Sequence, residues 1–194
     1  MLAPSIPDYD YGKVQRSPVT LDEFKRLQSV VGFTDKDRQA LYDAGEQLAD
    51  EAEALVDGWR KIIGSQEHLS EWFFGPDRKP DDDYKAAVKP RFVQWVVDTF
   101  KRPFDQTWLD YQEEIALRHT PAKKNKTDGV EAPPLVPLRY VLAFAVPLLA
   151  DMREHLMRKN LPVDEIERLH VAWTKAVILT LTLWSRPYTK QDWW

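Results

Sequence analysis

The chain has 194 residues, of which 43% are hydrophobic and 30% are charged. This balance is typical of a globular protein, and the length suits one domain spanning residues 1–194. The net charge of −4 comes from intermixed acidic and basic residues, so we expect no nucleic-acid partner. Because cysteine is absent, disulfides, thiolate-bound metals and cysteine nucleophiles are excluded, and histidine is the leading candidate for a soft ligand.

No segment of the sequence resembles a targeting signal or a membrane span. The first residues, MLAPSIPDYDYG, lack the basic start and apolar run of a signal peptide, so we expect a cytoplasmic location. The most apolar stretch, residues 176–184, is far shorter than the roughly 20 residues needed to cross a bilayer. We therefore expect no membrane partner.

The first third of the chain predicts an extended arm followed by helices. The arm runs to about Val19, and Thr20 or Asp22 then begins a short helix that ends near residue 31. Thr34 and Asp37 resemble a capping box, and apolar residues repeat at helical spacing after them. This pattern predicts one long helix, or two joined end to end, finishing near Gly64.

Residues 65–80 form a short aromatic segment with a turn, and helices follow it. One helix begins at residues 81–83 and reaches Thr99, and Pro90 predicts either a kink or a fresh start within it. Further helices are expected over residues 104–119, 137–157 and 162–185, with a possible kink at Pro147 and a loop after residue 119. With about seven helices, no alternating strand and no repeat, the fold class is all-α.

The helix over residues 104–119 places a histidine at its end. Trp108, Tyr111, Ile115 and His119 are three, four and four residues apart, so they share one side of the helix. Pro121 ends the helix, which leaves His119 beside a loop where a flat cofactor has room. A carbonyl near Ile115 is the expected partner of its second ring nitrogen. The alternative is a core histidine stabilised by the helix dipole, and spacing alone favours that alternative.

Several short motifs, in the same order along the chain, resemble the protoglobins, which are single-domain haem globins related to the globin domains of globin-coupled sensors. They are YDYG at 9–12, GW at 58–59, GSQEHL at 64–69, RF at 91–92, LDYQEEIALRH at 109–119, KKNKTD at 123–128, PLRYVLAF at 137–144 and WSRPYTK at 184–190. The resemblance implies a globin-like helical sandwich (34–186) with an N-terminal extension and extra helix (1–33). It also implies a haem b cofactor whose iron is bound by His119.

The resemblance further implies a set of haem-contacting residues. Val88 and Phe92 would face the iron, and their spacing of four places them on one helical face. Trp59 and Phe73 would close the pocket, and the later helix would contribute Phe144 and Leu148. For each of these residues the alternative is ordinary core packing.

Arg60 departs from the family pattern, because many protoglobins have a tyrosine beside the GW tryptophan. The arginine is open to three roles: contact with the ligand, contact with a haem propionate, or exposure to solvent. Arg91, with Lys123, Lys124 or Lys126, is a candidate for neutralising the propionates. A solvated charged loop is the alternative for each lysine.

Three functions are therefore open. The first is a haem protein that binds O₂, CO or NO at five-coordinate iron. The second is a haem-dependent enzyme that acts on nitric oxide or peroxide, or an engineered carbene-transfer catalyst, and the third is a cofactor-free helical interaction module. The resemblance also implies a homodimer through the last two long helices, whereas burial of their apolar residues within one chain is the alternative.

Overall fold

The computed structural model describes residues 6–190 and 193–194, and within these residues the secondary structure is helical. The described part has no strand, only an isolated bridge between Phe74 and Pro80. The prediction of an all-α fold is confirmed. The helices of 11 residues or more are α1 (Leu21–Val31), α2 (Asp35–Leu48), α3 (Ala52–Gly64), α5 (Asp82–Lys101), α6 (Gln106–Leu117), α9 (Ala145–Met157) and α10 (Val163–Ser185). The shorter helices are α4 (Glu67–Ser70), α7 (Lys124–Asp128) and α8 (Leu138–Ala143).

Side chains next to the helix starts supply the hydrogen bonds that the first turns lack. The Thr20 hydroxyl accepts from the Glu23 N–H at 3.2 Å, and the Glu23 carboxylate accepts from the Thr20 N–H at 2.8 Å. Asp81 and Asp105 accept from backbone N–H groups in the first turns of α5 and α6. At the other end of α1, Gly32 adopts a left-handed φ of 63°, which glycine tolerates without strain. The starts of α1, α5 and α6 and the end of α1 are therefore determined by residues that lie within a few positions of each boundary in the sequence.

The long apolar repeat after Thr34 forms two helices joined end to end, as predicted. The 3₁₀ turn η1 (Ala49–Glu51) separates α2 from α3, and α3 ends at Gly64. Helix α5 runs unbroken through Pro90, so a fresh start at that residue is wrong. Pro90 has no N–H for the carbonyl of Ala86, and the adjacent carbonyl, that of Lys85, accepts a hydrogen bond from Arg60 Nη1 at 2.9 Å.

Two predicted segments differ from the structure. The loop expected after His119 contains a helical turn, α7, and its Lys124 is buried with 3% of its surface exposed. The helix expected over residues 137–157 is divided at Phe144 into α8 and α9. Pro147 lies in the first turn of α9, where it needs no intrahelical partner, so the chain breaks ahead of the proline instead of kinking at it.

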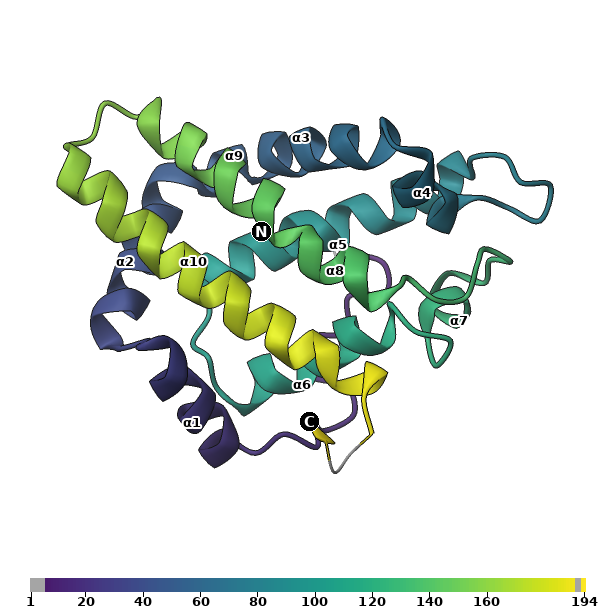
Figure 1. Cartoon of the computed structure of the whole chain (residues 1–194), viewed down its shortest axis with the longest axis horizontal. Coiled ribbons are helices and arrows are strands. Elements are labelled where there is room, and N and C mark those ends of the chain that lie inside the picture. Colours follow the sequence, from purple (N-terminus) through teal and green to yellow (C-terminus); the bar gives the residue numbers. More distant parts are fainter. Residues whose placement is uncertain (1–5, 191–192) are drawn as a thin grey trace.

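Helix α10 crosses the centre of the molecule and packs against α9, α2 and α6, while α5 packs against α2 and α3 (Figure 1). The buried side chains of α10 extend from Ile166 to Trp184 and form one continuous core with those of the other long helices. The short helices α4 and α7 lie toward the right-hand side of Figure 1, and α8 lies nearer its centre.

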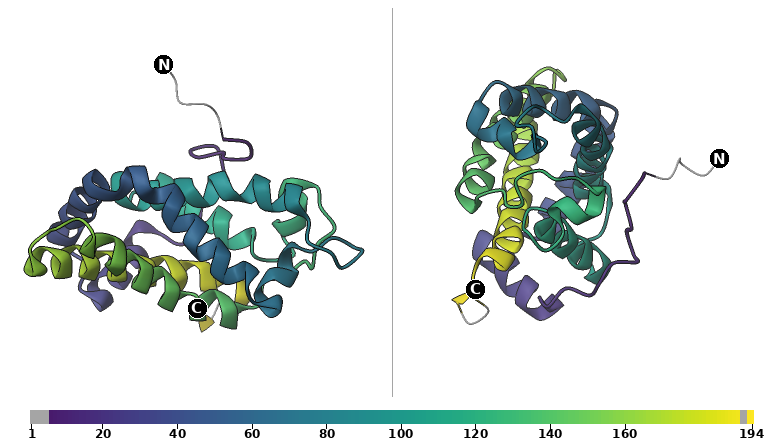
Figure 2. Two further views of the ribbon diagram at one scale, coloured as in Figure 1. Left: turned by 90° about the horizontal axis from the view of Figure 1, so that it is seen from above. Right: turned by 90° about the vertical axis from the view of Figure 1, so that its right-hand side faces the viewer.

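The N-terminal arm lies outside this bundle. Its first five residues fall outside the described part of the chain, and residues 6–19 run along the outer side of the bundle to α1 (Figure 2). The arm is held by the Ser17 N–H, which donates to Asp110 at 2.8 Å, and by Tyr9, which donates to Asp98 on α5. The arm therefore covers the surface formed by α5 and α6.

Candidate functional site

A cavity of about 680 Å³ lies between the end of α3, the middle of α5, the end of α6 and the break between α8 and α9. This volume is within the range of about 300–1,000 Å³ that small-molecule sites occupy. Most of the wall is aromatic or aliphatic, with contributions from Phe73, Val88, Phe92, Phe144 and Leu148. The segment from α4 to Pro80, helix α7, Val136 and the end of α10 also line the cavity.

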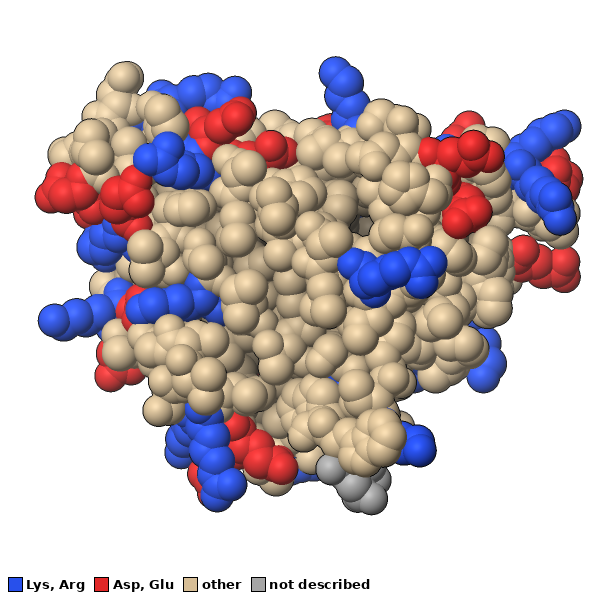
Figure 3. All heavy atoms as spheres, in the orientation of Figure 1, with Lys and Arg blue, Asp and Glu red and all other residues tan. Residues whose placement is uncertain are grey.

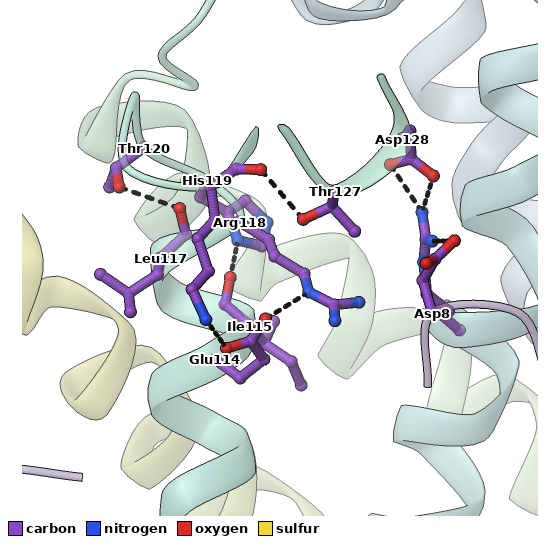
Figure 4. Close-up of polar contacts among 11 residues, drawn as sticks. Asp8, Glu114, Ile115, Leu117, Arg118, His119, Thr120, Thr127 and Asp128 are labelled. Atoms are coloured by element: carbon purple, nitrogen blue, oxygen red, sulfur yellow. Dashed lines mark hydrogen bonds and ion pairs between the residues drawn. The ribbon is translucent and has the colours of Figure 1, made fainter. Parts of the chain in front are cut away.

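His119 lies in the cavity wall, two residues beyond the end of α6. Its Nδ1 is 2.8 Å from the carbonyl oxygen of Ile115, the partner predicted from the sequence (Figure 4). A carbonyl only accepts, so Nδ1 carries the proton and Nε2 keeps its lone pair. Burial, opposed by the Ile115 bond, lowers the pKa of His119, so the ring is neutral at pH 7. A neutral imidazole fixed through Nδ1 is the form that binds a metal through Nε2.

Residues distant in the sequence fix the histidine's backbone and ring. The Trp184 ring stacks on the His119 ring with centroids 5.2 Å apart, and its Nε1 donates to Gln112 at 3.1 Å. The Tyr188 hydroxyl donates to the Val136 carbonyl at 2.7 Å, while the Val136 N–H donates to the His119 carbonyl at 2.9 Å. The sequence interpretation did not assign Trp184 or Tyr188 to the site, although both lie in the WSRPYTK motif.

Nine of the ten residues proposed from the sequence lie together in the cavity wall: Arg60, Phe73, Val88, Arg91, Phe92, Ile115, His119, Phe144 and Leu148. Trp59 is the exception. Its indole is fully buried behind Phe92, with ring centroids 5.5 Å apart, and it also packs on Trp95 and Trp173. Trp59 therefore lies behind the cavity wall, in the core, and the next residue of α3, Arg60, lines the cavity.

Of the three roles that the sequence leaves open for Arg60, contact with the ligand and contact with a propionate stay predictions. Its guanidinium lines the cavity, and Nη1 is held by the Lys85 carbonyl on α5 at 2.9 Å. The side chain is half-buried, so it has not left the pocket for solvent. A guanidinium has five N–H donors, so the single bond to Lys85 leaves donors for a bound anion.

Arg91 of α5 forms ion pairs with α7 and with the N-terminal arm at the cavity wall. Its Nη2 donates to both carboxylate oxygens of Asp128 at 2.7 and 2.8 Å, and its Nη1 lies 3.5 Å from Asp8 of the arm. Asp8 and Asp128 therefore approach the same point from the arm and from α7 (Figure 4). Lys124, four residues before Asp128 on α7, donates from its ammonium group to the Trp72 carbonyl at 2.7 Å. Burial lowers the pKa of Lys124 to about 8.

The charges of the wall favour an anionic, largely apolar ligand. Five basic residues and two acidic residues line the cavity: Arg60, Lys85, Arg91, Arg118 and Lys124 against Glu67 and Asp128. Haem has an apolar macrocycle, two carboxylates and an iron that needs an imidazole, and each of these has a counterpart in the wall. Among the described residues no group of three or more His, Cys, Asp or Glu is placed to hold a bare metal ion. The residues present therefore fit a haem.

The sequence interpretation also missed Tyr111 and Trp95, both of which line the cavity. The sequence places Tyr111 on the same helical face as His119, and this shared face could have predicted that Tyr111 lines the cavity. Trp95 lies three residues after Phe92 on α5, which is the spacing of neighbours on one helical face. Tyr111 is 2% exposed and Trp95 is 3% exposed, so both side chains also pack in the core.

The helical architecture and the cavity closed by a histidine at the end of α6 are those of a globin. The structure is similar to the globin domain of a globin-coupled sensor from Geobacter sulfurreducens, with a TM-score of 0.66 over 86% of this chain and 97% of that domain, at 16% identity. The profile of the Protoglobin family matches residues 20–194, so the chain belongs to that family. Among curated proteins no match was found. None of the described helices is long and apolar enough to cross a membrane.

Proposed function

We propose that the chain is a haem-binding globin that takes O₂, CO or NO at a five-coordinate iron bound by His119. The observation that carries the proposal is the hydrogen bond from His119 Nδ1 to Ile115, which leaves Nε2 free in the wall of a mainly apolar cavity. When bound, haem supplies reversible coordination of diatomic gases. Because the chain has no cysteine for a thioether bond, the haem would be held without covalent attachment, as haem b is.

The remaining wall residues would orient the group and keep water away. Arg91 and Lys124 lie on one side of the cavity, where their positive charges favour propionate carboxylates over a neutral ligand. Val88 and Phe92 give the α5 wall apolar surface, and neither side chain can compete with a gas for the iron.

The homodimer implied by the family resemblance is part of the proposal. Figure 3 shows a broad face with few charged residues over α8, α9 and α10. Exposed apolar side chains on these helices include Leu142 at 44%, Val146 at 70%, Val171 at 45% and Ile178 at 38%. A contiguous apolar face is typical of a surface that a second copy covers. Sedimentation of the parent chain and of Val146→Glu tests the proposed dimer. A dimeric parent chain and a monomeric variant support the interface, whereas a monomeric parent chain refutes it.

A haem-dependent enzyme is the second candidate, and Arg60 is the observation that favours it. A guanidinium in the wall provides donors for peroxide or for an anionic oxide of nitrogen, whereas a diatomic gas needs no such charge. Turnover of hydrogen peroxide or nitric oxide by the haem-loaded chain would establish this activity, and its absence would leave gas binding alone.

The experiment that tests the main proposal is a haem titration followed by absorption spectra of the ferrous chain with and without CO. We expect one haem per chain and a CO-dependent shift of the Soret band. His119→Ala should lose or alter this spectrum, and added imidazole should restore it, because the cavity left by the side chain admits a free ligand. His155→Gln is the matched control, since His155 pairs with Glu51 at 2.8 Å outside the cavity. A chain that binds no haem would refute the proposal and leave the cofactor-free interaction module.

A further inference from the structure

Three tyrosines form a continuous cluster from the cavity wall to the N-terminal arm. Tyr111 lines the cavity and is 2% exposed. Its ring centroid lies 4.7 Å from that of Tyr9 and 5.3 Å from that of Tyr11, and the Tyr9 and Tyr11 rings are 5.9 Å apart. Tyr9 and Tyr11 are half-buried and reach the outer surface of the arm. Aromatic rings in contact therefore connect the inside of the cavity to solvent.

The phenol of Tyr9 has a built-in proton acceptor. Its hydroxyl donates to the carboxylate of Asp98, a residue that is 3% exposed. Gln94 and Arg102 donate to the other oxygen of Asp98 at 2.8 and 2.9 Å, which holds the carboxylate in place. Burial and the bond to Asp98 raise the pKa of Tyr9 well above its ordinary value, so the phenol stays protonated. A protonated phenol gives up an electron readily only when its proton leaves at the same time, and Asp98 is placed to accept that proton.

Tyr11 has a different environment. The guanidinium of Arg102 lies 3.7 Å from the centre of its ring. A cation over the ring face stabilises the ring's electrons, so oxidation of Tyr11 is disfavoured. Of the two arm tyrosines, Tyr9 is therefore the one suited to lose an electron.

A second aromatic chain leads from the cavity into the core, and the most exposed of its tryptophans, Trp184, has 8% of its surface exposed. From His119 it passes through Trp184 to Trp95, with Trp95 and Trp184 centroids 5.6 Å apart. It continues to Trp173 and Trp59, both of which are fully buried. An electron taken from these indoles has no nearby replacement from outside, whereas Tyr9 is accessible to a reductant.

We infer that Tyr111 and Tyr9 conduct electrons from small phenols at the surface of the arm to a cofactor bound in the cavity, which gives the chain a peroxide-driven one-electron oxidation activity. The inference rests on the proposed haem function. When bound, haem would supply the two-electron reduction of hydrogen peroxide, which with two protons from solvent gives two waters. Tyr9 returns one electron through the ring of Tyr111, which keeps its own proton, while the proton of Tyr9 passes to Asp98. A phenol donor then reduces the Tyr9 radical, the proton returns from Asp98, and the donor's own proton goes to solvent. Two such cycles oxidise two phenols for each peroxide.

The test is freeze-quench electron paramagnetic resonance of the haem-loaded full chain after mixing with hydrogen peroxide. We expect a tyrosyl radical in the parent chain and loss of that signal in Tyr9→Phe and in Tyr111→Phe, since phenylalanine keeps the packing and removes the oxidisable phenol. Tyr42→Phe is the control, because Tyr42 is 48% exposed on α2, outside the cluster. Oxidation of guaiacol should fall in the first two variants and persist in the control, while the CO spectrum stays the same in Tyr9→Phe and Tyr42→Phe, whose changed side chains lie outside the cavity wall.

Asp98→Asn probes the proton step separately. It keeps the three rings and removes the carboxylate, so the radical should form more slowly, and the solvent deuterium isotope effect on its formation should change. Where this buried change unfolds the chain, Tyr9→Phe still decides the outcome, because its side chain is only half-buried. A signal unchanged in both phenylalanine variants, or one that belongs to tryptophan, overturns the relay. A haem-replete chain without a tyrosyl radical refutes the relay alone, whereas a chain without a Soret band refutes the proposed function as well.

Discussion

Gly45 of α2 lies close to α5, the helix that carries the cavity residues Val88, Arg91 and Phe92. A Cβ atom added at Gly45 would lie 2.7 Å from the Cβ of Phe100, a fully buried side chain on α5. Contacts this short do not occur in packed proteins, so Gly45→Ala forces α2 and α5 apart. Overpacking of this kind costs about 1–3 kcal/mol.

The same substitution has a favourable contribution, because alanine is better than glycine in a helix by about 1 kcal/mol. We therefore expect Gly45→Ala to lower the free energy of unfolding by as much as about 2 kcal/mol, the packing cost less the gain in helix propensity. Gly64→Ala is the control. Gly64 is the last residue of α3, and no heavy atom lies within 4 Å of its added Cβ. Its substitution should be neutral or stabilising by up to about 1 kcal/mol.

Chemical denaturation of the haem-free chain measures both variants, and the difference between them isolates the packing cost. Haem binding measured on the same samples shows whether a shift of α5 reaches the cavity, in which case Gly45→Ala binds haem more weakly than the parent chain. Gly64→Ala serves as the control for stability only, because Gly64 itself lines the cavity. If the two variants change stability by the same amount in the same direction, the close approach of α2 and α5 is wrong and the reasoning fails.

Three further predictions concern the cavity wall. Arg60→Met should weaken azide binding to the ferric haem-loaded chain by roughly tenfold or more, since a hydrogen bond from a charged donor is worth roughly 1.5–3 kcal/mol. The CO affinity of the ferrous chain should stay nearly constant, and equal losses of azide and CO affinity would contradict a charge effect. Because burial lowers the pKa of Lys124 from 10.5 to about 8, the unfolded chain binds more protons between these values, and the free energy of unfolding should rise with pH from about 8 to 9.5. Lys124→Met should lack this rise in denaturation curves measured across that range, and a rise of equal slope would argue against a buried ammonium. Asp128→Asn leaves the Arg91 guanidinium without its carboxylate and should cost about 3 kcal/mol in the same assay. Asp82→Asn, whose side chain is 89% exposed, should change stability by no more than about 0.5 kcal/mol, and similar losses in the two would refute the burial of the pair.

Much of the site could be predicted because it depends on neighbours along the chain. The hydrogen bond between His119 and Ile115 joins residues four apart, and Val88 and Phe92 share a face for the same reason. Thr20, Asp81 and Asp105 mark helix starts through bonds to residues three positions later. Helical geometry alone determines which of these groups meet.

Other parts of the site could not be predicted, since they depend on contacts between distant segments. Trp59 and Arg60 are consecutive, and only the packing of α3 on α5 decides that Trp59 enters the core while Arg60 reaches the Lys85 carbonyl. Lys124 belongs to a polar segment that favours a solvated loop, yet its ammonium is buried against the Trp72 carbonyl, 52 positions away.

The sequence by itself determined the all-α class, the long helices, the histidine at the end of α6 and, through its motifs, the family. These features follow from periodicity and capping, which act within a turn or two of helix, and from motifs that can be compared residue by residue. Only the tertiary structure decided that Tyr188 and Trp184 brace the histidine, that Asp8, Arg91 and Asp128 meet, and that Tyr9 touches Tyr111. Each of these contacts joins segments far apart in the chain, and their meeting depends on how whole helices pack, which no local pattern encodes.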